Sequence, residues 1–161
     1  MKDVLPDLTF QWLNGESLTD VLKAPFVKAS VNAHAVNGIY SITFWQSENY
    51  GLQISSNMNT IAFRDEVGVL SFNSLEGPCQ DSLIVDLPPS FLGARNLIKL
   101  VSDETDGQVA EAGFIMQLPD NQEITILAGS FPLTLSICGL AEVTYPFSPE
   151  RNFEHYRHVS F

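Results

Sequence analysis

Basic residues are scarce in this chain and absent from a long stretch of it. The 161 residues include 8 Lys and Arg against 19 Asp and Glu, which gives a formal net charge of −11 at pH 7. Residues 100–150 contain no Lys, Arg or His at all. Nucleic-acid binders neutralise phosphates with Lys and Arg, so this balance argues against binding to DNA, RNA or anionic membranes.

Cysteines and long apolar runs are also few. Cys79 and Cys138 could form one disulfide but do not require it. The N-terminal residues carry acids and a proline where a secretory signal needs an apolar stretch. No apolar run approaches the ~18 residues of a membrane span. We therefore expect a soluble, cytoplasmic protein with two reduced thiols and no membrane association.

Signatures of catalysis, metals and nucleotide cofactors are missing as well. The chain has no glycine-rich phosphate loop, and Gly129-Ser130-Phe131 lacks the second glycine of a nucleophile elbow. His155 and His158 are spaced like ligands on a helix, but no cysteine is near them in sequence. The acids at 103–107 do not form a calcium loop, because Gly113 occupies the position of the bidentate glutamate. We predict no cofactor and no metal, and we assign no catalytic residue.

Short strand patterns dominate what is present. Asn37-Gly38 is typical of a tight hairpin turn, and Pro119-Asp120-Asn121 separates two later apolar runs. The strands are predicted at residues 26–35, 39–46, 51–55, 59–64, 67–73, 82–86, 94–102, 109–118, 122–128 and 132–138. This spacing predicts a mainly β protein, or an α+β protein with few short helices, built as an antiparallel β-sandwich or open barrel. We expect one domain over residues 1–161, with a weak boundary near 86–90.

Two helices are predicted outside the strands. Ser17 and Asp20 resemble a capping box that opens a helix through Leu22. Ser148-Pro149-Glu150 is typical of a helix start and predicts a short helix over 149–155. We expect the following tail to dock on the sheet through its aromatic residues, while its two arginines pair with nearby acids; the alternative is that the tail forms part of a partner-binding edge. The residues concerned are Arg151, Phe153, Tyr156, Arg157 and Phe161.

The acidic stretch is the main candidate site. Its eight carboxylates are Asp103, Glu104, Asp106, Glu111, Asp120, Glu123, Glu142 and Glu150. We predict that a surface made of Asp103, Glu104, Asp106, Glu111, Asp120 and Glu123 binds a basic protein partner. The alternative is that the acidic residues have no binding role and only keep the protein soluble, as in many soluble bacterial proteins.

Two further hypotheses remain open. A carboxylate-dependent hydrolase would need a pair of acids such as Glu111 and Glu123, but strand alternation places both on the less apolar face, so we expect them to be solvated. A carbohydrate- or small-ligand-binding domain would instead use Trp12, Trp45 or Tyr50 as a stacking platform. Because Phe44 and Trp45 are neighbours on one strand, only one of them can face the core.

In general character the chain resembles bacterial immunity proteins that neutralise a basic toxin. The resemblance lies in small size, strong acidity, a β-rich pattern and the lack of a catalytic constellation. It implies a non-catalytic protein, of immunity or inhibitor type, that docks a basic partner. Oligomeric state cannot be read from these features.

Overall fold

The computed structural model describes residues 8–12, 16–61, 66–81, 83–87, 93–104 and 107–161. Their strands form one antiparallel sheet. Within these residues its strands are β1 (Lys28–His34), β2 (Gly38–Ser47), β3 (Tyr50–Thr60), β4 (Glu66–Glu76), β5 (Leu83–Val85), β6 (Asn96–Asp103), β7 (Val109–Gln117), β8 (Glu123–Ala128), β9 (Leu135–Cys138) and β10 (Arg157–Ser160). The order is β10-β6-β7-β8-β9-β2-β1-β5, and β3 and β4 continue from β2.

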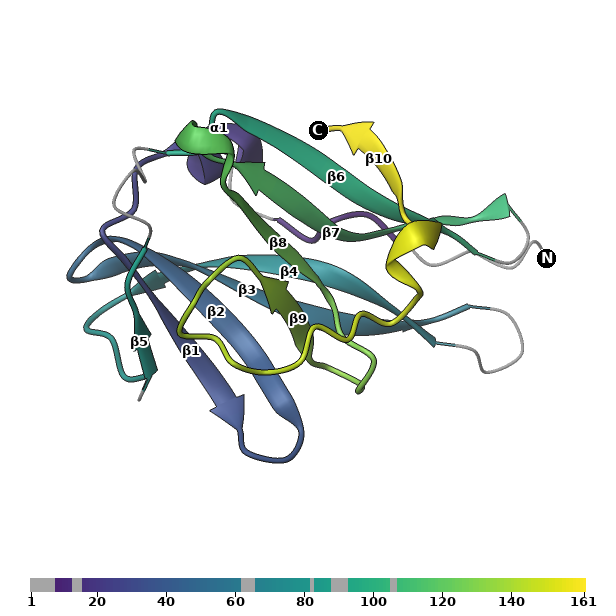
Figure 1. The fold of residues 1–161 in the computed structure, drawn as a ribbon, viewed down its shortest axis with the longest axis horizontal. Coiled ribbons are helices and arrows are strands. Elements are labelled where there is room, and N and C mark those ends of the chain that lie inside the picture. The colour runs from purple at the N-terminus through teal and green to yellow at the C-terminus, as the bar shows by residue number, and fades with distance from the viewer. Residues whose placement is uncertain (1–7, 13–15, 62–65, 82, 88–92, 105–106) are drawn as a thin grey trace.

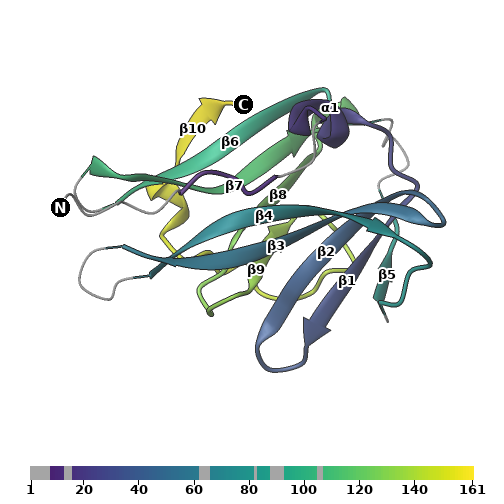
Figure 2. The ribbon, with the colours of Figure 1, turned by 180° about the vertical axis from the view of Figure 1, so that it is seen from behind.

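The sheet curls into a half-barrel of two facing layers (Figure 1). β6, β7 and β10 form one layer, and β1 to β4 form the other, with β8 and β9 leading from the first to the second (Figures 1 and 2). β4 faces β7 across the interior. The predicted mainly β, antiparallel sandwich or open barrel is therefore confirmed.

Aromatic and branched side chains fill the space between the layers. Phe44, Phe72 and Phe114 are buried at its centre, each from a different strand. Phe72 and Phe114 lie 5.8 Å apart between ring centroids, which joins the two layers directly. Burying such side chains contributes on the order of 2–3 kcal/mol each, so this contact is a main source of stability.

The hairpin predicted at Asn37-Gly38 is confirmed. β1 pairs with β2 from His34↔Gly38 onward, and Gly38 takes a φ of +106°, which a residue without a Cβ adopts easily. The predicted strands at 51–55 and 59–64 are in fact one strand, β3, which pairs with β4 along its whole length. Residues 62–65 lie outside the described part. Residues 55–57 are polar and interrupt the apolar pattern of the sequence. In the structure they pair with β4 and belong to the same strand.

The short N-terminal helix is also confirmed as α1 (Leu18–Lys23). The Ser17 hydroxyl accepts a hydrogen bond from the Asp20 amide at 3.4 Å, and Val21 and Leu22 face the core. No helix in the described part of the chain is long and apolar enough to cross a membrane. The weak boundary suggested near 86–90 falls mostly on residues outside the described part.

The helix predicted over 149–155 is wrong. Only a single 3-10 turn, η4 (Phe153–His155), forms there, and β10 follows it as an edge strand on β6. Glu150 does not begin a helix because its backbone pairs with the end of β8, where its amide donates to the Ala128 carbonyl at 3.0 Å. Its carboxylate reaches across the fold to the Gly68 amide, with 2.7 Å between Oε2 and N. Docking of the tail on the sheet is nevertheless confirmed, since Tyr156 is buried and Phe161 packs against Phe114.

Candidate functional site

The acids predicted to form one binding surface lie at two ends of the β7–β8 hairpin. Glu111 is near the start of β7, whereas Glu123 pairs with Gln117 at its far end. Six residues of extended strand separate the two ends by ~20 Å. Asp103 and Glu104 belong to the Glu111 end, and Asp120 belongs to the Glu123 end. Asp106 lies outside the described residues.

At the first end the acids are already paired. Asp103 receives two hydrogen bonds of 2.9 Å from the Arg157 guanidinium, and this contact lowers the pKa of Asp103 below its ordinary value. Arg151 lies 3.1 Å from Glu104 and 3.4 Å from Glu150. The predicted pairing of Arg151 and Arg157 with acids is therefore confirmed. Much of the negative charge at this end is therefore neutralised by arginines of the same chain.

Glu111 is paired too, and its predicted solvation is wrong. Its side chain is only 16% exposed and forms an ion pair with Lys99. Its other oxygen accepts a hydrogen bond of 2.7 Å from the Phe10 amide. The reason is that the N-terminal segment contacts β7 here, where the Glu111 amide donates to the Leu8 carbonyl at 2.8 Å, and alternation along β7 alone does not reveal this contact.

Asp120 and Glu123 remain exposed at the second end. The turn between β7 and β8, η3 (Pro119–Asn121), holds Asp120 at a φ of +65° and Asn121 at +59°. Asp and Asn tolerate this left-handed conformation better than other residues with a Cβ, which explains their place in the turn. Neither acid forms an ion pair within the described part of the chain.

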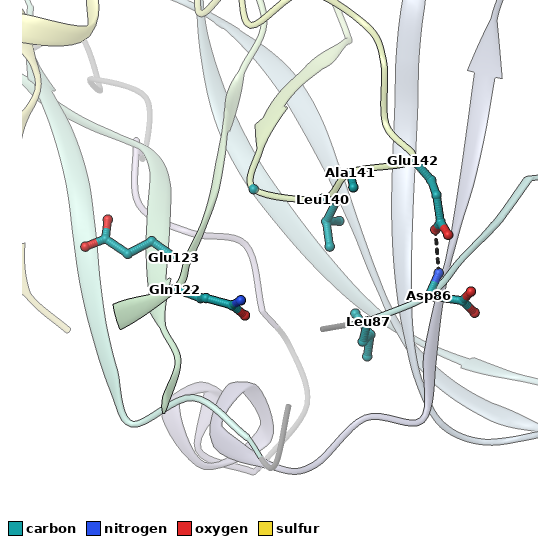
Figure 3. A pocket seen from close by; sticks show the side chains of 8 residues that line it. Asp86, Leu87, Gln122, Glu123, Leu140, Ala141 and Glu142 are labelled. Atoms are coloured by element: carbon teal, nitrogen blue, oxygen red, sulfur yellow. Dashed lines mark hydrogen bonds between the residues drawn. The ribbon is translucent and has the colours of Figure 1, made fainter. Parts of the chain in front are cut away.

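A pocket of about 550 Å³ opens beside this turn (Figure 3). Its walls come from three places in the sequence: the end of β5, the start of β8 and the loop after β9. The lining residues are Asp86, Leu87, Gln122, Glu123, Gly139, Leu140, Ala141 and Glu142. Leu87, Leu140 and Ala141 are apolar, while Asp86, Glu123 and Glu142 are carboxylates. We call this the acidic pocket.

Backbone geometry holds the loop after β9 in place. Gly139 has a φ of +102°, and a Cβ at this position would lie 2.1 Å from the Glu123 carbonyl oxygen. Only glycine permits this close approach of the loop to β8. The Glu142 carboxylate then accepts a hydrogen bond of 2.6 Å from the Asp86 amide and so fastens the loop to β5.

The side chains divide the acidic pocket into an apolar part and a charged rim. In Figure 3 Gln122 points towards Leu87 and Leu140, while Glu123 points away from them. Glu142 and Asp86 lie together on the opposite side. Among the described residues no Lys or Arg forms an ion pair with Asp86, Glu123 or Glu142. The rim therefore has a net negative charge that no ion pair within the described part of the chain balances.

The predicted stacking residues do not form a shared platform. Trp45 is only 2% exposed, and its indole N–H donates to Ser30 Oγ at 2.9 Å. Phe44 faces the core cluster, and Trp45 is covered on the other face of β2 by Gly51 and Lys28. Tyr50 is half-buried beside Ser74. Trp12 packs partly against the main core and donates to the Glu16 carbonyl.

The other reactive groups that the structure describes do not assemble into a catalytic or metal centre. In the described residues no group of three or more His, Cys, Asp and Glu side chains is placed to hold a metal ion. Both cysteines are free, as expected; Cys79 is half-buried and Cys138 is exposed. Ser130 Oγ lies 2.8 Å from Ser148 Oγ, so its hydrogen bond is to another hydroxyl and not to an imidazole that could activate it.

Comparisons with known proteins add no family to this description. No family model matches the chain, no curated protein is similar to it, and no solved structure matches it.

Two carboxylates of the acidic pocket, Asp86 and Glu142, were not predicted as site residues. The sequence pattern places Asp86 only at the end of a predicted strand, and Glu142 belongs to the acidic stretch but not to the predicted binding surface. They are 56 residues apart in sequence and meet only because β5 and the loop after β9 lie side by side. The one sequence signal was Glu142 itself, a lone charge between two uncharged stretches, 124–141 and 143–149.

Proposed function

We propose that the protein is a non-catalytic binding protein that docks a basic protein partner through the acidic pocket. The observation that carries the proposal is the charge pattern of that pocket, where three carboxylates border an apolar floor and form no ion pair with any Lys or Arg that the structure describes. An inhibitor or a protein of immunity type would act in this way, in keeping with the general resemblance noted above.

The shape of the pocket suits a lysine or arginine of the partner. Such side chains pack their aliphatic stems on apolar surface and keep their charged ends near carboxylates or water. Leu87 and Leu140 supply the apolar surface, and Glu142 with Asp86 supplies the charge at its edge. A cavity of about 550 Å³ is within the ordinary range for a binding site.

The distribution of charge also favours this end of the molecule for docking. The Asp103, Glu104 and Glu111 carboxylates are balanced by Arg157, Arg151 and Lys99. Asp120 and Glu123 are exposed and form no ion pair with the described residues, and Glu123 lines the acidic pocket. A basic partner is therefore steered towards this end, and its association rate falls as salt screens the field.

The test is affinity capture from the native host at low and high salt. Three proteins are compared: the wild type, the pocket variant Glu123→Gln/Glu142→Gln, and a control variant Glu48→Gln/Glu154→Gln. The two variants have the same net charge, and Glu48 and Glu154 are exposed residues outside the acidic pocket. Glutamine can still accept the hydrogen bond from the Asp86 amide, so the pocket variant should fold normally.

We expect the wild type and the control variant to capture the same basic protein at low salt. We expect the pocket variant to capture at least about tenfold less, because losing a charge in a desolvated contact costs 2 kcal/mol or more. Capture of acidic proteins only, or equal capture by both variants, contradicts the proposal.

A further inference from the structure

A second pocket lies on the outer face of the sheet, beside Trp45. It has a volume of about 320 Å³, and its walls come from β2, β3, the end of β4 and the segment 77–81. A cavity of this size is within the ordinary range for a small-ligand site. It shares no lining residue with the acidic pocket. We call it the outer pocket.

The indole of Trp45 is a fixed wall of the outer pocket. Its N–H donates to Ser30 on β1, and its ring also reaches β3, where a Cβ at Gly51 would lie 2.9 Å from Cε3. The ring therefore spans three strands, and glycine at position 51 leaves room for it. Because so little of the indole is exposed, it borders the outer pocket without offering an open stacking face.

A chain of hydrogen bonds holds Asp81 at the opposite wall. The Trp45 indole N–H donates to Ser30 Oγ at 2.9 Å, and the Ser30 hydroxyl donates in turn to Asp81 Oδ2 at 2.6 Å. The second carboxylate oxygen of Asp81 has no hydrogen-bond partner within the described part of the chain. One oxygen thus fixes the side chain, and the other is left to accept a bond from a ligand.

A row of polar side chains crosses this face of the sheet. Thr43 pairs with Ser30 on one side and with Gln53 on the other, so the three side chains point the same way. The Thr43 hydroxyl is buried and has no hydrogen-bond partner among the described residues. A buried hydroxyl without a partner costs stability, so stability alone does not explain this polar row.

The other walls of the outer pocket combine carboxylates, amides and apolar side chains. They are Glu76 and Asp81, Gln53 and Gln80, and Leu75 and Pro78. Carboxylates only accept hydrogen bonds, whereas amides also donate, so a ligand rich in hydroxyl groups can use both kinds of wall. Two carboxylates repel an anionic ligand. An ammonium group only donates, so it would leave the amide N–H groups unused.

We infer that the outer pocket binds a small neutral carbohydrate. Asp81 and Gln53 hydrogen-bond its hydroxyl groups, and Leu75 and Pro78 contact its C–H groups. This site does not rest on the proposed function, because the two pockets have no residue in common.

The test is a fluorescence titration of the full chain carrying Trp12→Phe, in which Trp45 is the only indole. The probes are the neutral sugars glucose, galactose, mannose and N-acetylglucosamine, with ethanolamine as a cation and glucuronate as an anion. Each titration is made at low and at high salt. Backbone amide shifts of the unaltered chain in the same titrations detect binding that does not change the indole emission.

Two variants test the walls, each with a matched control. Asp81→Asn is compared with Asp120→Asn, which removes the same charge at an exposed residue outside the outer pocket. Asparagine can still accept the bond from Ser30, so Asp81→Asn keeps the wall in place. Gln53→Ala is compared with Gln108→Ala, since both glutamines are half-buried and only Gln53 lines the outer pocket. Thermal melting of each variant verifies that it remains folded.

We expect at least one neutral sugar to give a saturating change whose dissociation constant does not depend on salt. We expect this constant to rise about tenfold in Asp81→Asn and about fivefold in Gln53→Ala, and to stay unchanged in both controls. The acidic-pocket variant Glu123→Gln/Glu142→Gln should bind the sugar like the wild type. The inference is overturned if no sugar gives a saturating change by either readout, if only ethanolamine or glucuronate does, or if the wall variants bind the sugar as tightly as their controls.

Discussion

Lys99 and Glu111 form an ion pair in the space between two aromatic rings. The Lys99 Nζ lies 5.3 Å from the ring centroid of Phe10 and 5.4 Å from that of Phe161. Glu111 pairs with this ammonium through one oxygen and accepts the Phe10 amide through the other. The N-terminal segment and the tail therefore meet at one charged pair on β6 and β7.

Removing the carboxylate from this pair should destabilise the fold. Glu111→Ala leaves the Lys99 ammonium, which is 18% exposed, and the Phe10 amide without their acceptor. We expect a loss of about 2 kcal/mol in the free energy of unfolding, measured by urea denaturation. The control is Glu123→Ala on the exposed start of β8, which should change it by less than about 0.5 kcal/mol. Equal effects of the two substitutions would show that the pair has no structural role.

Glu150 should make stability fall as the pH rises. Burial is the main cause that raises its pKa above 4.5, and the Gly68 amide and Arg151 only partly oppose this. A raised pKa means that the folded chain holds the proton more tightly than the unfolded chain does. Ionisation of the Glu150 carboxylate therefore lowers the free energy of unfolding. This loss is absent below pH 4.5 and reaches its full size above the raised pKa. The charged neighbours are Arg151, Glu104 and Glu66.

The variant Glu150→Gln isolates this effect. The amide oxygen of glutamine can still accept from Gly68, but the side chain does not titrate. We expect the stability of Glu150→Gln relative to the wild type to increase as the pH is raised from 4 to 7, measured by urea denaturation at a series of pH values. A relative stability that decreases over this range would contradict the assignment.

Tyr156 should be the tyrosine that resists ionisation. Burial raises its pKa to about 12, and its hydroxyl oxygen accepts the Arg151 amide at 2.9 Å. The protonated Tyr156 side chain therefore stabilises the fold below pH 10, and this stabilisation is lost as the pH approaches 12. An absorbance titration should contain a component near pH 12 that is missing in Tyr156→Phe. The same substitution should lower the free energy of unfolding at neutral pH by about 1 kcal/mol. If the component persists in this variant, it belongs to another tyrosine.

Gly68 should not tolerate a side chain. A Cβ there would lie 2.6 Å from the Ala128 Cβ and 2.8 Å from Glu150 Oε2, so Gly68→Ala must displace the carboxylate that fastens the tail. We expect a loss of about 2 kcal/mol in a denaturant titration. Gly107→Asn is the matched control, because φ is +74° there and no atom lies within 4 Å of the added Cβ. Similar results for both would mean that space at Gly68 is not limiting.

The fold was predictable from local patterns where turns are strongly marked. Asn37-Gly38 and Pro119-Asp120-Asn121 each specify a turn through residues that tolerate positive φ, so the hairpins on either side followed. The helix over 149–155 was predicted wrongly because Ser148-Pro149-Glu150 has the local pattern of a helix start. Glu150 instead satisfies the Gly68 amide, 82 residues away, and such a contact leaves no local trace.

Only the negative charge of the site was predictable from the sequence, not the residues that form it. The acidic stretch indicated a negative surface, but Glu104 is balanced by Arg151, 47 residues away, and Asp103 by Arg157, 54 residues away. These pairs depend on the docking of the tail on β6. The acidic pocket depends on the approach of β5 to the loop after β9, which neither composition nor strand alternation encodes.

Nuclear magnetic resonance with a lysine-rich peptide as probe tests the acidic pocket most directly. Backbone amide shifts are followed as the peptide is added at low salt and again at high salt. The account predicts shifts that saturate at Gln122, Glu123, Leu140 and Glu142 and that weaken with salt. Shifts centred on Asp103, Glu104 and Glu111, or no saturating shift anywhere, would contradict it.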